Sequence, residues 1–469
     1  MQTATMGGIA SMVSRAARSR TEARAAKPRD PLLVISGNRA GAISGSVERA
    51  LLAGTLHPGQ SLPTVRRLAE HLRVSPTTVA AAYRDLQLRG YITAAGRKGT
   101  HVSARPPLTA SAHTAVPEGV LDLATGSPDP AFLPDLRQTA LGLALPQHLY
   151  GTPCDESGLL RLAAEGFVRD GVSPDFLTVV GGGMAGVERT LEAHLRPGDR
   201  IALEDPSYHV VHDLALAMGL VPEPVPIDQS GFLPDAFEEA LHHQVAAVVV
   251  TPRAQNPTGA ALDAARARTL RGLLAKRPDV LLVEDDHSGP VAGASLHTLT
   301  TTHGREHWAI IRSVSKWLGP DLRLAVMSGD PGTISRIEGR QALGTGWVSH
   351  VLQSLVVALA ADPSVLQGVE QAAAAYTARR HALVNELGRR GVTAWGRSGL
   401  NVWVPVDDET ASAQALLDAG YAVARGDQFR LRTRPGIRIA IGRMDIADAP
   451  RIADTLTQPN LRRPQVRLG

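Results

Sequence analysis

The chain contains a single cysteine, Cys154, among its 469 residues. One cysteine excludes an intrachain disulfide framework and is typical of a protein from a reducing compartment. We expect Cys154 to be a small packed residue. The sequence also lacks any apolar run close to the roughly 18 residues that a membrane span requires, so we expect a cytoplasmic protein with no membrane partner. It lacks the Cys/His spacings and acidic clusters that bind metals, and we expect no metal site.

The length exceeds that of one ordinary core, and a hydrophobic content of 43% favours a globular protein of two or three domains. Residues 1–30 are rich in Ala and Arg and lack the apolar centre of a secretory signal. We expect them to be a flexible basic arm, or residues that precede the true start codon. Residues 460–469 are expected to form a tail.

Charge is distributed unevenly along the chain. Residues 31–103 hold eight arginines and one lysine against three acidic residues, a net charge of +6, whereas the whole chain carries only +4. Residues 1–30 add a further +4, so the remainder is acidic, with a net charge of −6. This asymmetry predicts a polyanionic partner for the amino-terminal part alone.

Residues 31–103 carry the pattern of a helix-turn-helix. Apolar residues recur at helical spacing in residues 43–53, and again from about residue 64 to residue 72. After a short turn, Ser75 is a suitable helix cap and Pro76 a suitable first residue of a third helix that ends near Arg89. Its apolar side chains share one face, and Thr77, Thr78, Ala81 and Arg84 lie on the other. The second helix of such a pair can enter a DNA major groove.

Two short strand-like runs, residues 91–93 and 100–103, flank Gly96-Arg97-Lys98-Gly99. A hairpin tipped with two cations suits contact with phosphates or a minor groove. The alternative is a three-helix adaptor with solvated arginines. The motifs at residues 62–69, 74–79 and 96–100 resemble the winged helix-turn-helix of the GntR regulators. The resemblance implies that Arg66, Thr77, Thr78 and Arg97 face DNA, and the further DNA-binding candidates are Ser75, Arg84 and Lys98. Pro76 stands where the family commonly has Arg, which removes one phosphate contact.

Residues 104–120 have no periodicity and are rich in Pro, Ala, Ser and Thr, which is typical of an extended linker. From residue 121 to residue 459, strand-like runs alternate with helical ones. The expected strands are residues 178–180, 200–203, 246–250, 280–283 and 309–311. Continuous apolar strands separated by helices predict a mainly parallel sheet covered on both faces. Ligands of such sheets bind beyond the carboxyl ends of the strands.

Polar motifs follow several of these expected strands. Gly181-Gly182-Gly183-Met184 can bring backbone N–H groups to a phosphate at a helix start, or can simply make a tight turn. Tyr208 can stack on a planar ring or pack in the core. Asn256 can donate to a phenolate oxygen. The carboxylates of Glu284-Asp285-Asp286-His287 can bind a protonated pyridine nitrogen, or cap a helix.

The strongest motif is Ser313-Val314-Ser315-Lys316, with Arg323 seven residues beyond the lysine. A lysine amine can form a Schiff base with an aldehyde, while hydroxyls and a guanidinium hold a phosphate. This combination suits a pyridoxal 5′-phosphate (PLP) site.

Together these motifs resemble the fold-type I aminotransferases over about residues 120–455. The resemblance implies an α/β domain with a mainly parallel sheet and a smaller carboxyl-terminal α/β subdomain, following the winged helix-turn-helix. It also implies roles for individual residues: Lys316 attaches PLP, Asp285 pairs with its ring nitrogen, Tyr208 stacks on the ring and Asn256 contacts O3′. The phosphate would be bound by Gly182, Gly183, Met184, Ser313, Ser315 and Arg323, with Tyr150 reaching the phosphate of a partner subunit. Arg438 would bind a substrate carboxylate.

His287 departs from the pattern of these enzymes. It stands where many relatives have a tyrosine that touches O3′. A neutral imidazole and a charged one would tune the ring differently, so the departure puts transamination in doubt. The alternative is a packed histidine.

A GntR-like head joined through a proline-bearing linker to an aminotransferase-like body resembles the MocR family of transcription regulators, over about residues 40–455. Residues 251–257, 285–287 and 346–350 are most similar to its PtsJ-like branch, which is linked to pyridoxal kinase regulation. The resemblance implies a homodimeric regulator that binds double-stranded operator DNA and senses PLP, or an amine or amino acid that reacts with PLP. The alternatives are an active PLP-dependent transaminase with an accessory DNA-binding domain, and a DNA-binding protein with an inert body.

Overall fold

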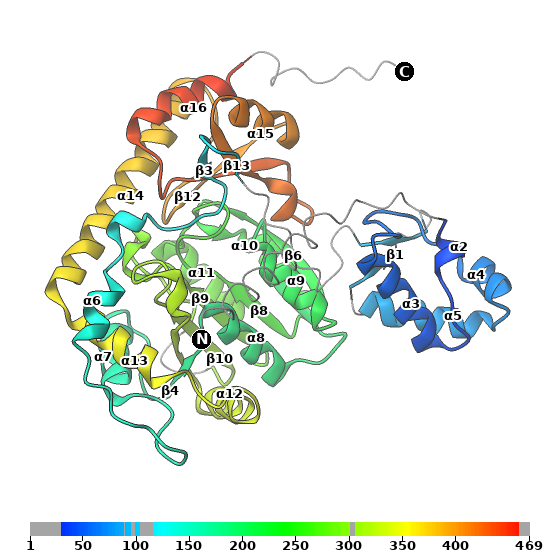
Figure 1. Ribbon diagram of the computed structural model, residues 1–469, viewed down its shortest axis with the longest axis horizontal. Helices are drawn as coiled ribbons and strands as arrows, with labels where there is room; N and C mark the ends of the chain where they lie inside the picture. Colours follow the sequence, from blue (N-terminus) through cyan, green and yellow to red (C-terminus); the bar gives the residue numbers. More distant parts are fainter. Residues whose placement is uncertain (1–29, 89, 95–98, 104–115, 301–304, 459–469) are drawn as a thin grey trace, which may run out of the picture. The chain divides into compact units, whose positions relative to one another are not determined.

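The computed structural model describes residues 30–88, 90–94, 99–103, 116–300 and 305–458 (Figure 1). The chain divides into two compact units, Met1–Ala112 and His113–Gly469. Each unit has its own hydrophobic core and is described by itself.

The first unit contains the helix-turn-helix and the hairpin that the sequence predicts. Its elements are α2 (Pro31–Val34), α3 (Ala40–Leu52), α4 (Val65–Leu72), α5 (Pro76–Leu88), β1 (Ile92–Ala94) and β2 (Thr100–Val102). β1 and β2 pair in antiparallel fashion. The helices α3 and α4 both pack against α5. The unit is therefore a winged helix-turn-helix.

The helix ends of this unit follow from local chemistry. Thr64 caps α4 by accepting a hydrogen bond from the Arg67 N–H, and α4 ends where Arg73 takes a left-handed conformation (φ 55°). The Ser75 hydroxyl accepts the Thr78 N–H at 3.1 Å, so α5 begins at Pro76, as predicted. The inward face of α5 is buried as the apolar pattern predicts, at Val79, Ala82, Tyr83 and Leu86.

The second unit is built on an eight-stranded sheet in the order β4-β11-β10-β9-β8-β5-β6-β7. Its strands are β4 (Leu177–Val180), β5 (Arg200–Asp205), β6 (Val221–Asp228), β7 (Gly231–Phe232), β8 (Ala247–Val250), β9 (Leu281–Asp286), β10 (Trp308–Ser313) and β11 (Ala325–Gly329). β10, β9, β8, β5 and β6 are mutually parallel. β11 runs antiparallel to both β10 and β4, so β4 points the same way as β10.

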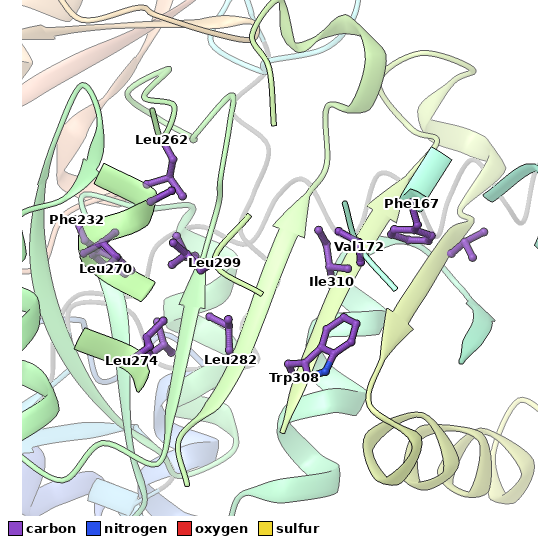
Figure 2. Packing of buried hydrophobic residues seen from close by; sticks show 14 of the residues in the cluster. Phe167, Val172, Phe232, Leu262, Leu270, Leu274, Leu282, Leu299, Trp308 and Ile310 are labelled. Carbon is purple, nitrogen blue, oxygen red and sulfur yellow. The ribbon is translucent and has the colours of Figure 1, made fainter. Parts of the chain in front are cut away.

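Helices cover both faces of this sheet, as continuous apolar strands require. They are α6 (Leu136–Leu141), α7 (Ser157–Arg169), α8 (Gly183–His194), α9 (His209–Ala217), α10 (Pro234–His242), α11 (Ala264–Ala275), α12 (Pro331–Leu343) and α13 (His350–Ala361). Alternate residues of one strand enter different cores: Leu282 lies in the cluster with Phe167 and Leu270, and Val283 in the cluster with Val187. Figure 2 shows the first cluster, with Leu282 and Ile310 projecting from neighbouring strands.

The sequence did not predict β6, β7 or β11. β6 contains Pro222, Pro224 and Pro226, which usually argue against a strand. Because successive N–H groups of a strand point to opposite sides, prolines at alternate positions remove donors from one side only. The residues between the prolines keep their N–H groups, and β6 still pairs with β5 along six positions.

A smaller subdomain contains a four-stranded sheet in the order β12-β14-β13-β3. Its strands are β3 (Leu121–Leu123), β12 (Asn401–Pro405), β13 (Tyr421–Arg425) and β14 (Gly436–Ala440), and its helices are α14 (Pro363–Arg389), α15 (Glu409–Asp418) and α16 (Ala449–Leu456). β3 pairs in parallel with β13 and is therefore an edge strand. The amino-terminal end of the unit thus joins a sheet otherwise made of carboxyl-terminal strands (Figure 1).

Within the described ranges, no single helix is long and apolar enough to span a membrane, although α13 and α14, bent by 77°, meet the length and composition criteria as a pair.

The expectation for Cys154 is wrong, because its side chain is exposed. It lies in a segment without helix or strand between α6 and α7. Its backbone carbonyl accepts a hydrogen bond from the Gln353 side chain at 2.8 Å.

Candidate functional site

The polar motifs of the second unit gather at the carboxyl edge of the large sheet. Gly182 follows β4, Tyr208 follows β5, Asn256 follows β8, Asp285 lies near the end of β9 and Lys316 follows β10. Because these strands point the same way, residues far apart in sequence meet at one edge.

Lys316 is half-buried, and its amine Nζ donates to the backbone carbonyl of Gly126 at 2.8 Å. Burial, followed by the nearby Arg438 guanidinium, lowers the pKa of Lys316 to about 8, while Asp285 acts in the opposite direction. A lysine with this pKa has an appreciable fraction of neutral amine near pH 7.5, which is the form that attacks an aldehyde.

Asp285 is the buried acid of the site. Burial, reinforced by the negative charge of Asp286, raises the pKa of Asp285 to about 7. Its Oδ1 atom is buried and has no hydrogen-bond partner among the described residues. A buried carboxylate oxygen without a partner is costly, so this atom is suited to a cationic N–H from a bound group.

Glycines at the start of α8 leave space beside Asp285. Gly182, with φ 99°, is the cap residue of α8, a backbone conformation that favours glycine. A Cβ at Gly182 would lie 3.1 Å from Nη2 of Arg323, and a Cβ at Gly183 would lie 3.4 Å from Oδ1 of Asp285. The absence of side chains here leaves the helix start and a guanidinium accessible to an anion.

Two hydroxyls adjoin the same place. The Ser313 hydroxyl donates to the Ser315 hydroxyl at 3.0 Å and accepts the Ser315 N–H at 3.2 Å. The Ser313 Cβ lies 3.7 Å from the position of a Cβ at Gly183. These contacts join Gly182, Gly183, Ser313, Ser315 and Arg323 into one polar cluster. Met184, by contrast, packs its side chain against the apolar cluster beneath α8.

Arg438 and Asn256 meet on the other side of the lysine. The Arg438 guanidinium donates through Nη1 to the Asn256 side-chain oxygen at 3.0 Å and through Nη2 to the Ala124 carbonyl. It also lies over the ring of Phe429, 4.8 Å from the centroid. Burial lowers the pKa of Arg438 to about 10, and it therefore stays charged at neutral pH.

Tyr208 lies within electrostatic reach of Arg438, Asp285 and Arg323, and burial raises its pKa. Tyr150 is not brought to this group, because its side chain is 93% exposed and its ring lies edge-on to that of Trp347, at a centroid distance of 5.8 Å. An exposed tyrosine is what a role toward a second subunit requires, and the contact itself stays a prediction.

His287 is fixed by two hydrogen bonds of its ring. Nε2 lies 3.0 Å from the Ala254 carbonyl, and Nδ1 lies 3.2 Å from the Ser288 hydroxyl. Since a carbonyl only accepts, Nε2 carries the proton. Burial, followed by the charge of Lys316, lowers the pKa of His287 to about 4, so the ring is neutral at pH 7. A neutral imidazole agrees with both interpretations of His287, namely a residue that tunes the cofactor ring and a histidine packed in the core.

The residues present fit PLP. A lysine amine with a lowered pKa, an unpartnered buried carboxylate oxygen and a side-chain-free helix start beside a guanidinium lie in one place. These groups match the aldehyde, the pyridine nitrogen and the phosphate of PLP, respectively.

Two residues that support the site from outside it were missed from the sequence. Arg253 forms a bidentate ion pair with Asp286, and Asp122 folds the turn whose carbonyls accept from Lys316 and Arg438. The spacing Asp122-Leu123-Ala124-Thr125 is typical of a carboxylate that caps the following N–H groups, and this signal could have identified the turn. No comparable signal in the sequence pairs Arg253 with an acid 33 residues away.

A second hollow, of about 870 Å³, lies at the opposite, amino-terminal edge of the sheet, next to the residues that precede β5, β8 and β10. Two of its cations are already paired, Lys276 with Glu238 at 2.9 Å and Arg277 with Asp279 at 2.8 Å. It is far along the strands from Lys316, and we assign it no ligand.

The structure describes five of the seven residues of the first unit that were expected to bind DNA. Arg66, Ser75, Thr77 and Arg84 are exposed, and Thr78 is half-buried. The Ser75 hydroxyl lies 2.7 Å from that of Thr77 and 2.8 Å from that of Thr78, which orders the start of α5. Arg97 and Lys98 lie outside the described residues.

Comparison with protein families matches both units. The model for aminotransferase class I and II matches residues 152–456, and the model for bacterial regulatory proteins of the gntR family matches residues 39–102.

Similar proteins include named regulators and solved enzymes. The vitamin B6 salvage pathway transcriptional repressor PtsJ of Salmonella typhimurium is 36% identical over 91% of this chain and 99% of its own length. The pyridoxine biosynthesis transcriptional regulator PdxR of Corynebacterium glutamicum is 33% identical over 52% of this chain and 55% of its own length. The kynurenine aminotransferase of Pyrococcus horikoshii superposes with a TM-score of 0.66 and 22% identity, covering 72% of this chain and 90% of that one, which shows the shared fold.

Proposed function

Because the chain belongs to the MocR-type regulators, which join a GntR-type DNA-binding domain to a class I and II aminotransferase domain, we propose that it is a transcription regulator controlled by PLP. The observation that carries this proposal is the Lys316 amine, with its lowered pKa, near the unpartnered Asp285 Oδ1, in a chain that also contains a helix-turn-helix. The relatives named for vitamin B6 salvage and pyridoxine biosynthesis support control of vitamin B6 metabolism.

When bound, PLP supplies an aldehyde that a lysine amine can capture and a ring that withdraws electrons. Lys316 provides the amine and Asp285 the carboxylate for the ring nitrogen. Asn256 would contact the ring oxygen, with the neutral His287 nearby, and Tyr208 would provide a face for stacking. The phosphate would be held by Ser313, Ser315, Arg323 and the backbone of Gly182, Gly183 and Met184.

Two groups of this site, the Lys316 amine and the Asp285 carboxyl, can gain or lose a proton near neutral pH. Lys316 Nζ must lose a proton before it reacts, and its pKa of about 8 makes that loss accessible near neutral pH. The Asp285 carboxyl, with a pKa of about 7, is driven to its ionised form by a cationic ring nitrogen. Binding of the ring therefore relieves the unfavourable burial of this acid.

Arg438 indicates the chemical class to which a second effector would belong. Its guanidinium faces the same space as Lys316 and is suited to a carboxylate. We therefore propose that the effector is PLP itself, or an amine or amino acid that reacts with bound PLP.

The regulator is proposed to act as a cytoplasmic homodimer on double-stranded operator DNA. Exposed apolar residues support self-association: Tyr150 is 93% exposed, Leu149 71%, Leu141 81% and Leu343 90%. Two DNA-binding units in a dimer would read two half-sites. Arg66, Ser75, Thr77, Thr78 and Arg84, with Arg97 and Lys98 of the hairpin, are the proposed contacts.

The test compares wild type with Lys316→Ala in the full chain. Wild type should gain visible absorbance with PLP and change its affinity for its own promoter DNA by at least several-fold. Lys316→Ala should lose both effects while keeping the affinity for DNA measured without PLP. Lys276→Ala, at an exposed lysine paired with Glu238, serves as the matched control and should behave like wild type. An unchanged PLP response in Lys316→Ala would overturn the proposal.

A second candidate function is a working aminotransferase. It is favoured by the joint presence of Lys316, Asp285 and Arg438, which form the minimum apparatus for that reaction. Sustained conversion of an amino acid and a 2-oxo acid by the PLP-loaded protein would support it, and the absence of turnover would leave the regulatory function alone.

A further inference from the structure

The two cations of the PLP site both donate to one short turn. Lys316 Nζ donates to the Gly126 carbonyl at 2.8 Å, and the Arg438 guanidinium donates to the Ala124 carbonyl. The two carbonyls belong to residues two positions apart, directly after β3. One turn is therefore bonded to the residue that takes PLP and to the residue suited to a carboxylate.

Asp122 builds this turn. Its Oδ1 accepts the N–H groups of Ala124 at 2.8 Å and Thr125 at 3.1 Å, and its Oδ2 accepts the Thr125 hydroxyl at 2.8 Å. These three bonds fold the chain so that the Ala124 and Gly126 carbonyls face the site. Gly126 has φ 68°, and a Cβ there would lie 3.6 Å from Cζ of Arg438.

The turn is held unequally on its two sides. After it, Asp129 accepts from Arg379 at 3.0 Å, and its N–H donates to the Tyr376 hydroxyl at 2.9 Å, so the following residues are tied to α14. Before it, β3 is a three-residue edge strand whose one partner among the described strands is β13, and Leu123 packs in the core of the small subdomain. A change in the turn is therefore expected to move β3 rather than α14.

β3 is also the first strand described after the junction of the two units. The first unit ends at Ala112, and residues 116–120 lead directly into Leu121. Any shift of β3 acts on the chain that connects the ligand-binding unit to the DNA-binding unit, whatever their relative placement.

Ligands compete for the donors that hold the turn. A lysine that commits its nitrogen to PLP loses the three-hydrogen ammonium that now serves the Gly126 carbonyl. A carboxylate at Arg438 competes with the Ala124 carbonyl for the same guanidinium. We infer that Asp122 is a positioning residue that couples occupancy of Lys316 and Arg438 to β3 and to the linker. This inference rests on the proposed PLP-dependent regulation.

The test uses Asp122→Ala in the full chain. We expect PLP to bind within about threefold of the wild-type affinity, because Asp122 is not among the proposed PLP contacts. The PLP-induced change in DNA affinity should fall at least tenfold. The matched control is Asp408→Ala, because Asp408 caps α15 in the same subdomain by accepting two N–H groups at 2.9 Å each. It should lose similar stability and keep the response.

The outcomes separate this inference from the proposed function. If wild type does not respond to PLP, the proposed function fails. If wild type and Asp408→Ala respond and Asp122→Ala responds equally, the inference alone fails. Loss of the response in both variants would show a general effect of destabilisation and would also overturn the inference.

Hydrogen exchange on wild type gives an answer that does not depend on the folding of a variant. The Leu121 N–H donates to the Gly420 carbonyl at 2.9 Å, and the Ala124 and Thr125 N–H groups donate to Asp122. PLP should change the exchange of residues 121–125 at least severalfold. A change confined to residues around Lys316, with residues 121–125 unaltered, would contradict the coupling.

Discussion

Arg253 and Asp286 form a bidentate ion pair next to Asp285, the acid of the proposed PLP site. Nε and Nη2 of Arg253 donate to the two carboxylate oxygens of Asp286, each at 2.8 Å. Arg312 lies 3.6 Å from the same carboxylate. These guanidinium groups oppose the effect of burial and hold the pKa of Asp286 below its usual range. The resulting permanent negative charge helps to raise the pKa of its neighbour Asp285.

Replacing Arg253 with Ala should strongly destabilise the protein. The change leaves the fully buried Asp286 with one distant guanidinium, and breaking a buried pair in this way typically costs about 3–5 kcal/mol. Thermal unfolding of the full chain measures the loss. Lys276→Ala, which removes an exposed pair, should leave the midpoint almost unchanged. Equal midpoints for the two variants would contradict the structural role of Arg253.

The capture of PLP by Lys316 should accelerate with pH. With a pKa of about 8, the neutral fraction of this amine rises about tenfold between pH 7 and pH 9. The initial rate, followed by borohydride trapping and peptide mapping of Lys316, should rise accordingly. Arg438→Gln removes a positive charge that lowers this pKa, so its profile should move to higher pH. A flat profile from pH 7 to 9 would show that the amine is not titrating there.

Glu204→Gln should make the stability of the protein less dependent on pH between about 4.5 and 8. Burial raises the pKa of Glu204 in the folded state to about 8, from an ordinary value of 4.5. Between these values the folded state holds a proton that the unfolded state releases, so stability falls as pH rises. The amide cannot ionise, and the variant should match wild type at pH 4.5 and exceed it by a few kcal/mol at most at pH 8. Thermal unfolding of both proteins at the two pH values measures the difference. An equal change of stability with pH in wild type and in Glu204→Gln would contradict the raised pKa of Glu204.

Arg66→Ala should weaken DNA binding without changing its dependence on PLP. An exposed arginine that neutralises one phosphate contributes about 0.9 to the slope of log K against log salt. The variant should therefore show a slope smaller by about that amount in a titration with promoter DNA. Arg137→Ala, at an exposed arginine of the other unit, should keep the wild-type slope.

The sequence predicted those parts of the structure that are specified locally. The helix caps Thr64 and Ser75 and the central strands have strong signals within a few residues, and they lie where expected. β3 was missed because three residues are too few to show an alternating apolar pattern. Its first residue, Leu121, pairs with Tyr421, which lies 300 residues further along the chain. The Arg253–Asp286 pair likewise depends on the segment after β8 meeting the end of the neighbouring strand β9.

The polar motifs at strand ends predicted the neighbourhood of the site but not its contacts. Lys316, Asp285 and Gly183 meet because parallel strands end at one edge, which sequence order alone implies. That Lys316 and Arg438 share a turn with Asp122 follows only from the pairing of the small sheet.

The pairing of Leu121 with Tyr421 has a consequence for synthesis of the protein. The helix-turn-helix precedes this contact and has its own core, so it can fold while the ribosome is still translating the body. The sheet that receives β3 is completed only when β14 has emerged. A chain interrupted before Ala440 would therefore carry a complete helix-turn-helix and an incomplete four-stranded sheet.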